Sequence, residues 1–217
     1  MMSLDPLDRI RELKQQAVVH RNRDKLDLAL RVLDEAESRL ESLLADPTLD
    51  AERRAQLKAE LADTHGMKGG VQRRRQRLDD ALGEYEAGAA VEGTESTTTY
   101  NLGNTVLLSL VLGRASLDDA QTQQRIAAMV SRLERQVVGA RSDEWWAYAD
   151  LAQFRLLGGD VSGAYSAYAA GRTTGPSASE LQRPLDVLAE LAAALKDRHP
   201  QRHAQILDFI DWARRPA

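Results

Sequence analysis

The sequence has no cysteine among its 217 residues. This absence excludes disulfide frameworks, thiol catalysis and zinc or iron–sulfur sites with cysteine ligands. A chain of this length buries enough surface to fold without a covalent or metal staple. One or two ordinary domains, or one extended repeat array, fit the length.

The sequence also has no unusually high content of glycine, proline or apolar residues, and no large net charge. The net charge is −4 and the pI about 5.6, which argues against a general nucleic-acid or membrane-surface binder. The most apolar stretch, TVLLSLVL (105–112), is far shorter than the roughly 20 residues of a membrane helix. The N-terminal residues MMSLDPLDRIRELK lack the pattern of a signal peptide. We therefore expect a cytoplasmic protein that binds neither nucleic acid nor membranes.

What the sequence does contain is helical periodicity. Leu26, Leu30, Leu33, Ala36 and Leu40 recur at three- and four-residue steps and would share one helix face. No segment alternates as a strand does, and STTTY (96–100) is interpreted as the entry to a helix. The sequence therefore predicts an all-α fold.

Capping signals divide the chain into about ten helices. Asp5-Pro6 and Asp46-Pro47 have the pattern of an N-cap followed by proline. Ser116 with Asp119, and Ser177 with Glu180, have capping-box spacing. The predicted helices are 5–22, 24–45, 48–68, 71–91, 97–113, 117–138, 143–157, 160–173, 178–197 and 201–214.

Two segments, RLDDALGEYEAG (77–88) and GDVSGAYSAYAAG (159–171), share a spacing of small, aromatic and small residues. In the first segment these residues are Ala81, Tyr85 and Gly88. The matching residues of the second are Ala164, Tyr168 and Gly171. Small residues let two helices approach closely, and a ring fills the remaining gap. The pattern predicts repeated helical hairpins.

On these residues the chain resembles the tetratricopeptide repeat (TPR) family, whose unit is a 34-residue helical hairpin. The copy at 145–178 matches best, with Pro176 where the family usually has proline. Further copies start at residues 62 and 96, and a weaker one covers 10–43. The run from Glu60 to Gly88 also looks like TPR proteins of bacterial signalling and conflict loci. The resemblance implies a right-handed α-solenoid of about five hairpins, forming one domain over 5–214.

The resemblance also implies a partner-binding groove. In this family the first helix of each hairpin lines a concave face at fixed positions. Carried over, those positions are Asp63, Arg73, Arg74, Asn101, Asn104, Trp146, Asp150 and Gln153. The lysine pattern with which some members clamp a terminal carboxylate is absent.

Signals for catalysis or metal binding are weaker than their structural alternatives. His199 and His203 are four residues apart, but Pro200 lies between them and no third ligand is evident. His20 and His65 fall on packing positions, and GMKGGV (66–71) lacks the spacing and preceding strand of a phosphate loop. Gly69 and Gly70 are instead expected to pack between helices. We expect no enzyme activity, metal or cofactor.

The basic run QRRRQR (72–77) has two readings. Its arginines could bind a phosphate, a carboxylate or an acidic peptide. Alternatively, they form a solvated helix end that offsets Asp79, Asp80 and Glu84.

The aromatic residues gather at the C-terminal end, where eight of the ten lie within 145–217. Trp145 and Trp146 point about 100° apart on a helix. Either both pack against flanking helices or one ring lines the partner groove. The apolar stripe of 201–214, which includes Phe209 and Trp212, would seal the end of the array or form a homodimer.

The expected function is a non-enzymatic scaffold that binds a peptide or protein segment in its concave groove. The alternative is a regulatory sensor that binds a small anionic ligand there through Arg73 and Arg74.

Overall fold

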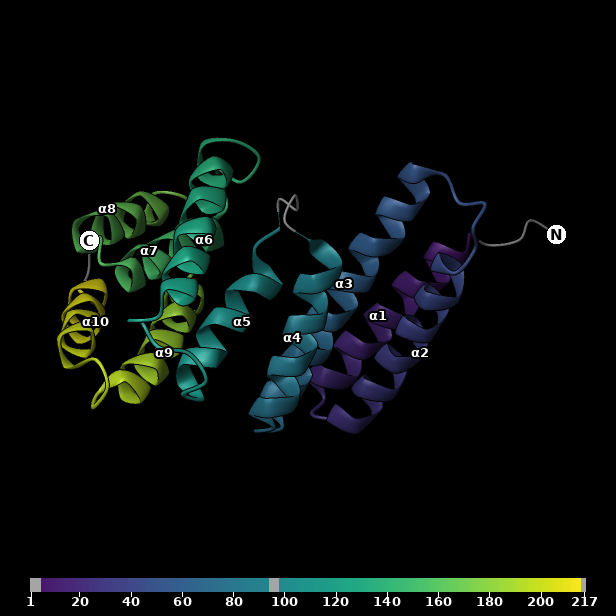
Figure 1. Ribbon diagram of the computed structural model, residues 1–217, viewed down its shortest axis with the longest axis horizontal. Coiled ribbons are helices and arrows are strands. Elements are labelled where there is room, and N and C mark those ends of the chain that lie inside the picture. Colours follow the sequence, from purple (N-terminus) through teal and green to yellow (C-terminus); the bar gives the residue numbers. More distant parts are fainter. Residues whose placement is uncertain (1–4, 94–97, 216–217) are drawn as a thin grey trace. The chain divides into compact units, whose positions relative to one another are not determined.

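The computed structural model describes residues 5–93 and 98–215, and every regular element in those ranges is an α-helix (Figure 1). This confirms the all-α prediction. The ten helices are α1 (Pro6–Asn22), α2 (Leu26–Leu44), α3 (Ala51–Arg74), α4 (Leu78–Glu92), α5 (Tyr100–Val111), α6 (Ala120–Val138), α7 (Trp145–Gly158), α8 (Val161–Arg172), α9 (Ala178–Leu195) and α10 (Pro200–Ala213).

The contacts divide the chain, which the sequence predicts to be one domain, into two compact units. Unit 1 is Met1–Thr105 and unit 2 is Val106–Ala217, so the boundary falls within α5. In unit 1, α1 packs on α2, α2 on α3, and α3 on α4. In unit 2, α6 and α8 pack on α7, and α9 packs on α10. Neighbours in sequence are therefore neighbours in space within each unit.

Of the four predicted helix starts, two are confirmed and two are wrong. Ser116 donates its N–H to Asp119 at 2.8 Å, but Asp119 and not Ser116 is the N-cap of α6, which begins at Ala120. The Asp5 carboxylate accepts from the Leu7 N–H at 3.0 Å, with proline in the first turn of α1. Ser177 and Glu180 form a complete capping box at α9. Asp46, in contrast, accepts from the N–H of Thr48 at 2.8 Å inside a turn. Helix α3 begins later, at Ala51, and Asp50 is its cap.

The largest correction concerns the break predicted between 68 and 71. Helix α3 runs through its glycines to Arg74, and α4 begins only at Leu78. A Cβ at Gly69 would lie 2.7 Å from the Tyr85 ring, and one at Gly66 would lie 2.8 Å from Asn101 Oδ1. These glycines let α4 and α5 approach α3, as the packing interpretation of Gly69 predicted. The contact offsets the usual helix cost of glycine, about 1 kcal/mol.

The small–aromatic–small pattern is buried in both hairpins. All six of its residues are buried: Ala81, Tyr85, Gly88, Ala164, Tyr168 and Gly171. A Cβ at Gly171 would lie 2.6 Å from the Cβ of Tyr148. The internal repeat thus identified helix–helix contacts that the structure contains.

Trp145 packs inside unit 2, and a proline explains its polar contact. Its ring meets Tyr168 edge-on with centroids 4.9 Å apart, and its indole N–H donates to the Glu180 carbonyl at 3.2 Å. In a regular helix that carbonyl would accept from residue 184, but Pro184 has no N–H. The indole therefore satisfies a carbonyl that the proline leaves unpaired.

The apolar stripe of α10 packs within unit 2. Phe209 is 0% exposed and lies among the rings of Tyr165, Tyr168 and Trp212, with centroids 5.2, 5.4 and 5.7 Å away. These rings join α10 to α8. Phe209 is therefore used inside the unit, whereas Trp212 is half-buried, and both predicted roles of the stripe, sealing an array and forming a homodimer, stay predictions.

Two glycine substitutions test the close packing on α3. Gly69→Ala would push a methyl group into the Tyr85 ring, and we expect a loss of roughly 1–3 kcal/mol in the free energy of unfolding. Gly83→Ala is the matched control, because nothing lies within 4 Å of a Cβ at that exposed position of α4. It should stabilise the protein by roughly 0.5–1 kcal/mol. Urea denaturation measures both, and a Gly69→Ala variant as stable as wild type would refute the close contact.

Candidate functional site

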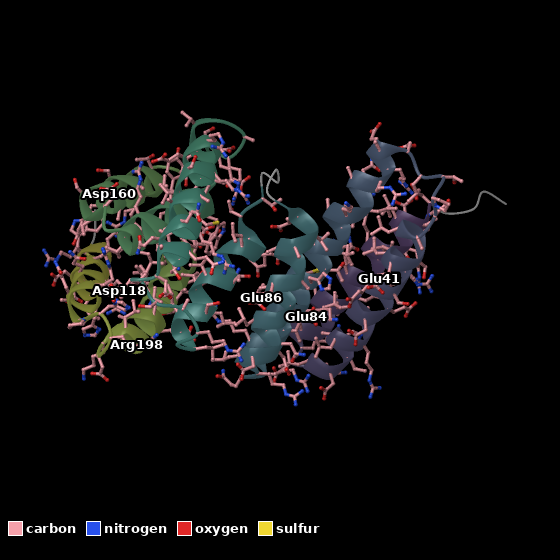
Figure 2. All side chains as sticks on the ribbon, in the orientation of Figure 1. Glu41, Glu84, Glu86, Asp118, Asp160 and Arg198 are labelled. Atoms are coloured by element: carbon pink, nitrogen blue, oxygen red, sulfur yellow. The ribbon has the colours of Figure 1, made fainter. Side chains whose placement is uncertain are left out.

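Helix α3 carries a buried ionic network on the side that faces α2 and α4. The Lys68 ammonium lies 2.6 Å from Glu37, 2.9 Å from Asp34 and 3.0 Å from Glu84. His65, one turn earlier, places Nδ1 2.9 Å from Glu84 and Nε2 3.6 Å from Glu37. Lys68 is only 9% exposed and His65 8%. The network therefore ties three helices together through one nearly buried cation. Figure 2 labels Glu84 on α4.

The pKa values show that the network is tightly paired. Burial opposes the charge of Lys68, but hydrogen bonds to Glu37, Asp34 and Glu84 outweigh it and raise the pKa of Lys68 above its usual range. Burial likewise opposes the charge of Glu84, but hydrogen bonds from His65 and Lys68 lower the pKa of Glu84. Both groups are held in their charged forms. The network is thus arranged for stability, with its polar atoms directed at one another.

The opposite side of α3 presents an exposed aromatic ring. Tyr100, the first residue of α5, is 55% exposed, although a Cβ at Gly66 would come within 3.0 Å of its ring. Its hydroxyl lies 3.8 Å from the Cβ position of Gly70. The ring therefore extends along α3 from Gly66 to Gly70. We call the surface formed by Gly66, Gly70, Arg73, Tyr100 and Asn104 the α3–α5 face.

Five of the predicted partner-binding residues belong to unit 1, and they differ in how far their side chains are already used. Arg73 is half-buried, close enough to Tyr85 to affect its pKa. Exposed Arg74 donates to the backbone carbonyl of Arg21 at 3.4 Å. Asp63 is exposed and forms an ion pair with Lys14.

The two predicted asparagines also differ. Asn101 is 1% exposed, and its amide donates to the Ala62 carbonyl at 2.9 Å and to Glu92 at 2.7 Å. It therefore joins α5 to α3 and to the end of α4. Asn104 is half-buried, and its amide donates to the Tyr100 carbonyl at 2.8 Å. Its side-chain oxygen remains available for a partner's N–H group.

The other three predicted residues lie on α7 of unit 2. Trp146 is half-buried, in contrast to buried Trp145. Asp150 is half-buried, and burial raises its pKa to about 6, with only a weak opposing effect of Arg141. Gln153 is 3% exposed, and its amide nitrogen has no hydrogen-bond partner in the described ranges. These three and the unit 1 residues stay predictions as partner-binding residues.

The histidines at the C-terminal end have structural contacts. His199 Nε2 accepts from the Leu117 N–H at 3.2 Å, and His203 Nδ1 lies 2.8 Å from the Ala192 carbonyl. Among the described residues, no three acidic, histidine or cysteine side chains are placed to hold a metal ion. Nor is any helix there long and apolar enough to cross a membrane.

The sequence analysis predicted neither the ionic network nor the exposed position of Tyr100. The interpretation of QRRRQR had assigned Glu84 to the arginines, whereas Glu84 pairs with Lys68 and His65. A signal existed in the three-residue spacing of His65 and Lys68 and of Asp34 and Glu37. Tyr100 falls on the fifth position of the copy starting at residue 96, a position that lines the groove in the TPR family.

The comparisons with known proteins add no family to this picture. The sequence matches no protein-family model, and a search of curated proteins finds no significant match.

Replacing Lys68 should lower the free energy of unfolding. In Lys68→Met, Glu37 and Glu84 would be buried without their cation, and we expect a loss of roughly 3–5 kcal/mol at neutral pH. Glu84 has a lowered pKa when folded, so its contribution is present above its ordinary value of 4.5 and is lost as pH falls through the folded pKa. The difference from wild type should therefore shrink on acidification. Chemical denaturation across pH measures it.

Lys58→Met is the control for that experiment, because Lys58 is an exposed lysine of the same helix. It should change stability by less than about 0.5 kcal/mol. Equal effects of the two substitutions would contradict the network.

The pKa of Asp150 is shifted in the opposite direction to that of Glu84, so the predicted effect of pH on stability is also opposite. Its pKa of about 6 lies above its ordinary value of 3.8, so its ionisation costs stability as pH rises from 3.8 through about 6. Asp150→Asn should therefore raise the melting temperature at neutral pH, and the gain should fade towards pH 3.8. Asp143→Asn, at an exposed position before α7, should give no such gain. Thermal melts over this pH range would refute the prediction if both variants behaved alike.

Proposed function

We propose that this protein is a non-enzymatic interaction scaffold whose α3–α5 face binds an acidic, extended segment of a partner protein. The observation that carries the proposal is Tyr100, a ring 55% exposed that lies on glycines. Aromatic residues seated in this way supply a large contact area at low entropic cost and are enriched at the centres of protein interfaces. The TPR resemblance supports the same class of function and a right-handed solenoid.

The charge of the neighbouring turn supports an acidic partner. Arg75 is paired with Asp27 at 2.8 Å and Arg77 with Asp80 at 3.4 Å, so these two are neutralised within the chain. Arg74 is exposed, and its bond goes to a backbone carbonyl, which leaves its charge without a carboxylate in the described ranges. A guanidinium of this kind forms strong, directional bonds to carboxylates.

Asn104 supports an extended rather than a helical partner. It stands one turn after Tyr100 on α5, and its amide nitrogen already donates to the Tyr100 carbonyl. That bond fixes the side chain and leaves its oxygen to accept from a backbone N–H. A helical segment uses most of its N–H groups internally, whereas an extended one has them available. Trp146, Asp150 and Gln153 are proposed as further contacts in unit 2.

Peptide selection tests the proposal. A displayed library of random peptides is selected on the wild-type protein, and affinities of the selected peptides are measured by fluorescence anisotropy. We expect acidic sequences, with binding weakened by about 1–3 kcal/mol in Tyr100→Ala and in Arg74→Ala. Arg31→Ala, at an exposed arginine of α2, is the charge-matched control and should bind as wild type does.

Melting curves accompany each variant so that loss of folding is not mistaken for loss of binding. If Tyr100→Ala folds normally and binds the selected peptides at full strength, the α3–α5 face is not the site. If Arg74→Ala does so, the acidic side chains of the peptide do not depend on Arg74, which adjoins that face on α3. Binding of inorganic phosphate that Arg73→Ala and Arg74→Ala abolish, without any peptide binding, would favour the alternative of a sensor for small anions.

A further inference from the structure

Unit 2 contains a polar pocket of about 510 Å³, and none of the predicted partner-binding residues lines it. It is formed where the turn between α9 and α10 meets the turn before α6 and the end of α7. Its lining includes Asp118, Gln123, Arg198, His199, Arg202 and Gln205. Figure 2 labels Asp118 and Arg198, which come from two different turns.

Both arginines of the pocket lack a carboxylate partner in the described part of the chain. Arg198 donates to the backbone carbonyls of Leu110 at 2.6 Å, Ala194 at 3.0 Å and Ala115 at 3.4 Å. Arg202 donates to that of Leu156 at 2.6 Å. The Leu110 and Leu156 carbonyls lie at the C-terminal ends of α5 and α7. A guanidinium has five N–H donors, so both side chains keep donors beyond those used on carbonyls. Burial without a counter-charge also lowers the pKa of Arg202.

A glycine leaves room for Arg202 at the end of α7. Gly159 follows α7 with φ +96°, a left-handed conformation, and a Cβ there would lie 3.1 Å from Arg202 Nη2. The bond to the Leu156 carbonyl holds the guanidinium at this position. A positioned cation loses less conformational entropy on binding than a free one, which favours recognition of an anion.

His199 adds a third donor to the same pocket. Its side chain is 9% exposed, and its Nε2 accepts the Leu117 N–H, so the neutral ring carries its proton on Nδ1. Nδ1 lies 3.8 Å from the Asp118 carboxylate, which is too long for a hydrogen bond. In this tautomer the Nδ1–H makes no hydrogen bond to Asp118 and is a donor that a ligand in the pocket can use.

The start of α10 supplies backbone donors. His199 is its N-cap and Pro200 its first residue, and no side chain caps the helix. The first N–H groups of a helix have no partner within it, and the helix dipole favours an anion there. Gln201 and Arg202, the next two residues, both line the pocket.

We propose that this pocket binds the phosphate group of a small phosphorylated molecule, held by Arg198, Arg202, the His199 Nδ1–H and the first turn of α10. Gln205 and the side-chain oxygen of Gln123 can contact hydroxyl groups on the remainder of the molecule, since the Gln123 amide nitrogen already donates to the Leu117 carbonyl at 2.6 Å. Asp118 opposes binding from the rim, where its side chain is 87% exposed. The pocket shares no residue with the α3–α5 face, whose residues all belong to unit 1, or with the further contacts proposed on α7.

Titration followed by NMR tests the proposal on the full chain. Inorganic phosphate and ribose 5-phosphate are added to ¹⁵N-labelled protein at constant ionic strength, with chloride and ribose as controls. We expect the backbone amides of Gln201 and Arg202 to shift with a Kd on the order of 1 mM or tighter for ribose 5-phosphate. Arg202→Gln should weaken binding about tenfold or more. Arg125→Gln, at an exposed arginine of α6, should leave it unchanged.

A gain-of-affinity variant guards against misfolding. Asp118→Asn removes the opposing charge at an exposed position and should tighten binding roughly two- to fivefold. Absence of amide shifts at Gln201 and Arg202 would overturn the proposal. So would equal affinities of wild type, Asp118→Asn and a folded Arg202→Gln. Arg74→Ala should not affect this titration. A negative result here would therefore overturn the phosphate pocket without bearing on the proposed peptide site.

Discussion

The close approach of α4 and α5 to α3 is the constraint on which unit 1 depends. Gly66 and Gly69 leave no room for a side chain, because Asn101 and the Tyr85 ring occupy the positions of their Cβ atoms. This contact explains why α3 continues through a glycine-rich segment that would otherwise favour a break. It also fixes the start of α5, and so decides where Tyr100 is exposed.

The same close approach determines the electrostatics of α3. With α4 held near, Glu84 reaches Lys68 and His65, and α2 brings Glu37 to the same ammonium. A lysine at such a depth is tolerated only with several carboxylate partners, because desolvation costs several kcal/mol per ion. The two sides of α3 thus divide the roles. One side uses charge to hold helices together, and the other leaves the Tyr100 ring exposed.

Local signals predicted the fold better than the site. Helical periodicity and the caps at Asp5 and Ser177 depend on neighbours in sequence, and the structure confirms them. The repeat of small and aromatic residues also predicted buried contacts, because it records which residues face the next helix. The break near Gly69 was predicted wrongly, since the compensation for glycine comes from Tyr85, a residue of another helix. The Lys68 network was not predicted because the carboxylate partners of Lys68 also lie on other helices, α2 and α4.

Side chains that bond distant backbone carbonyls show how stability and binding share residues in unit 2. Trp145 bonds the carbonyl that Pro184 leaves free, and Arg198 and Arg202 bond carbonyls at helix ends. An indole has a single donor, so Trp145 is fully used by this contact. A guanidinium has five, so an arginine that secures a helix end is positioned and still has donors for a ligand. Fixing such a cation without a carboxylate beside it leaves a positive charge in a defined place, and that charge is what an anion recognises.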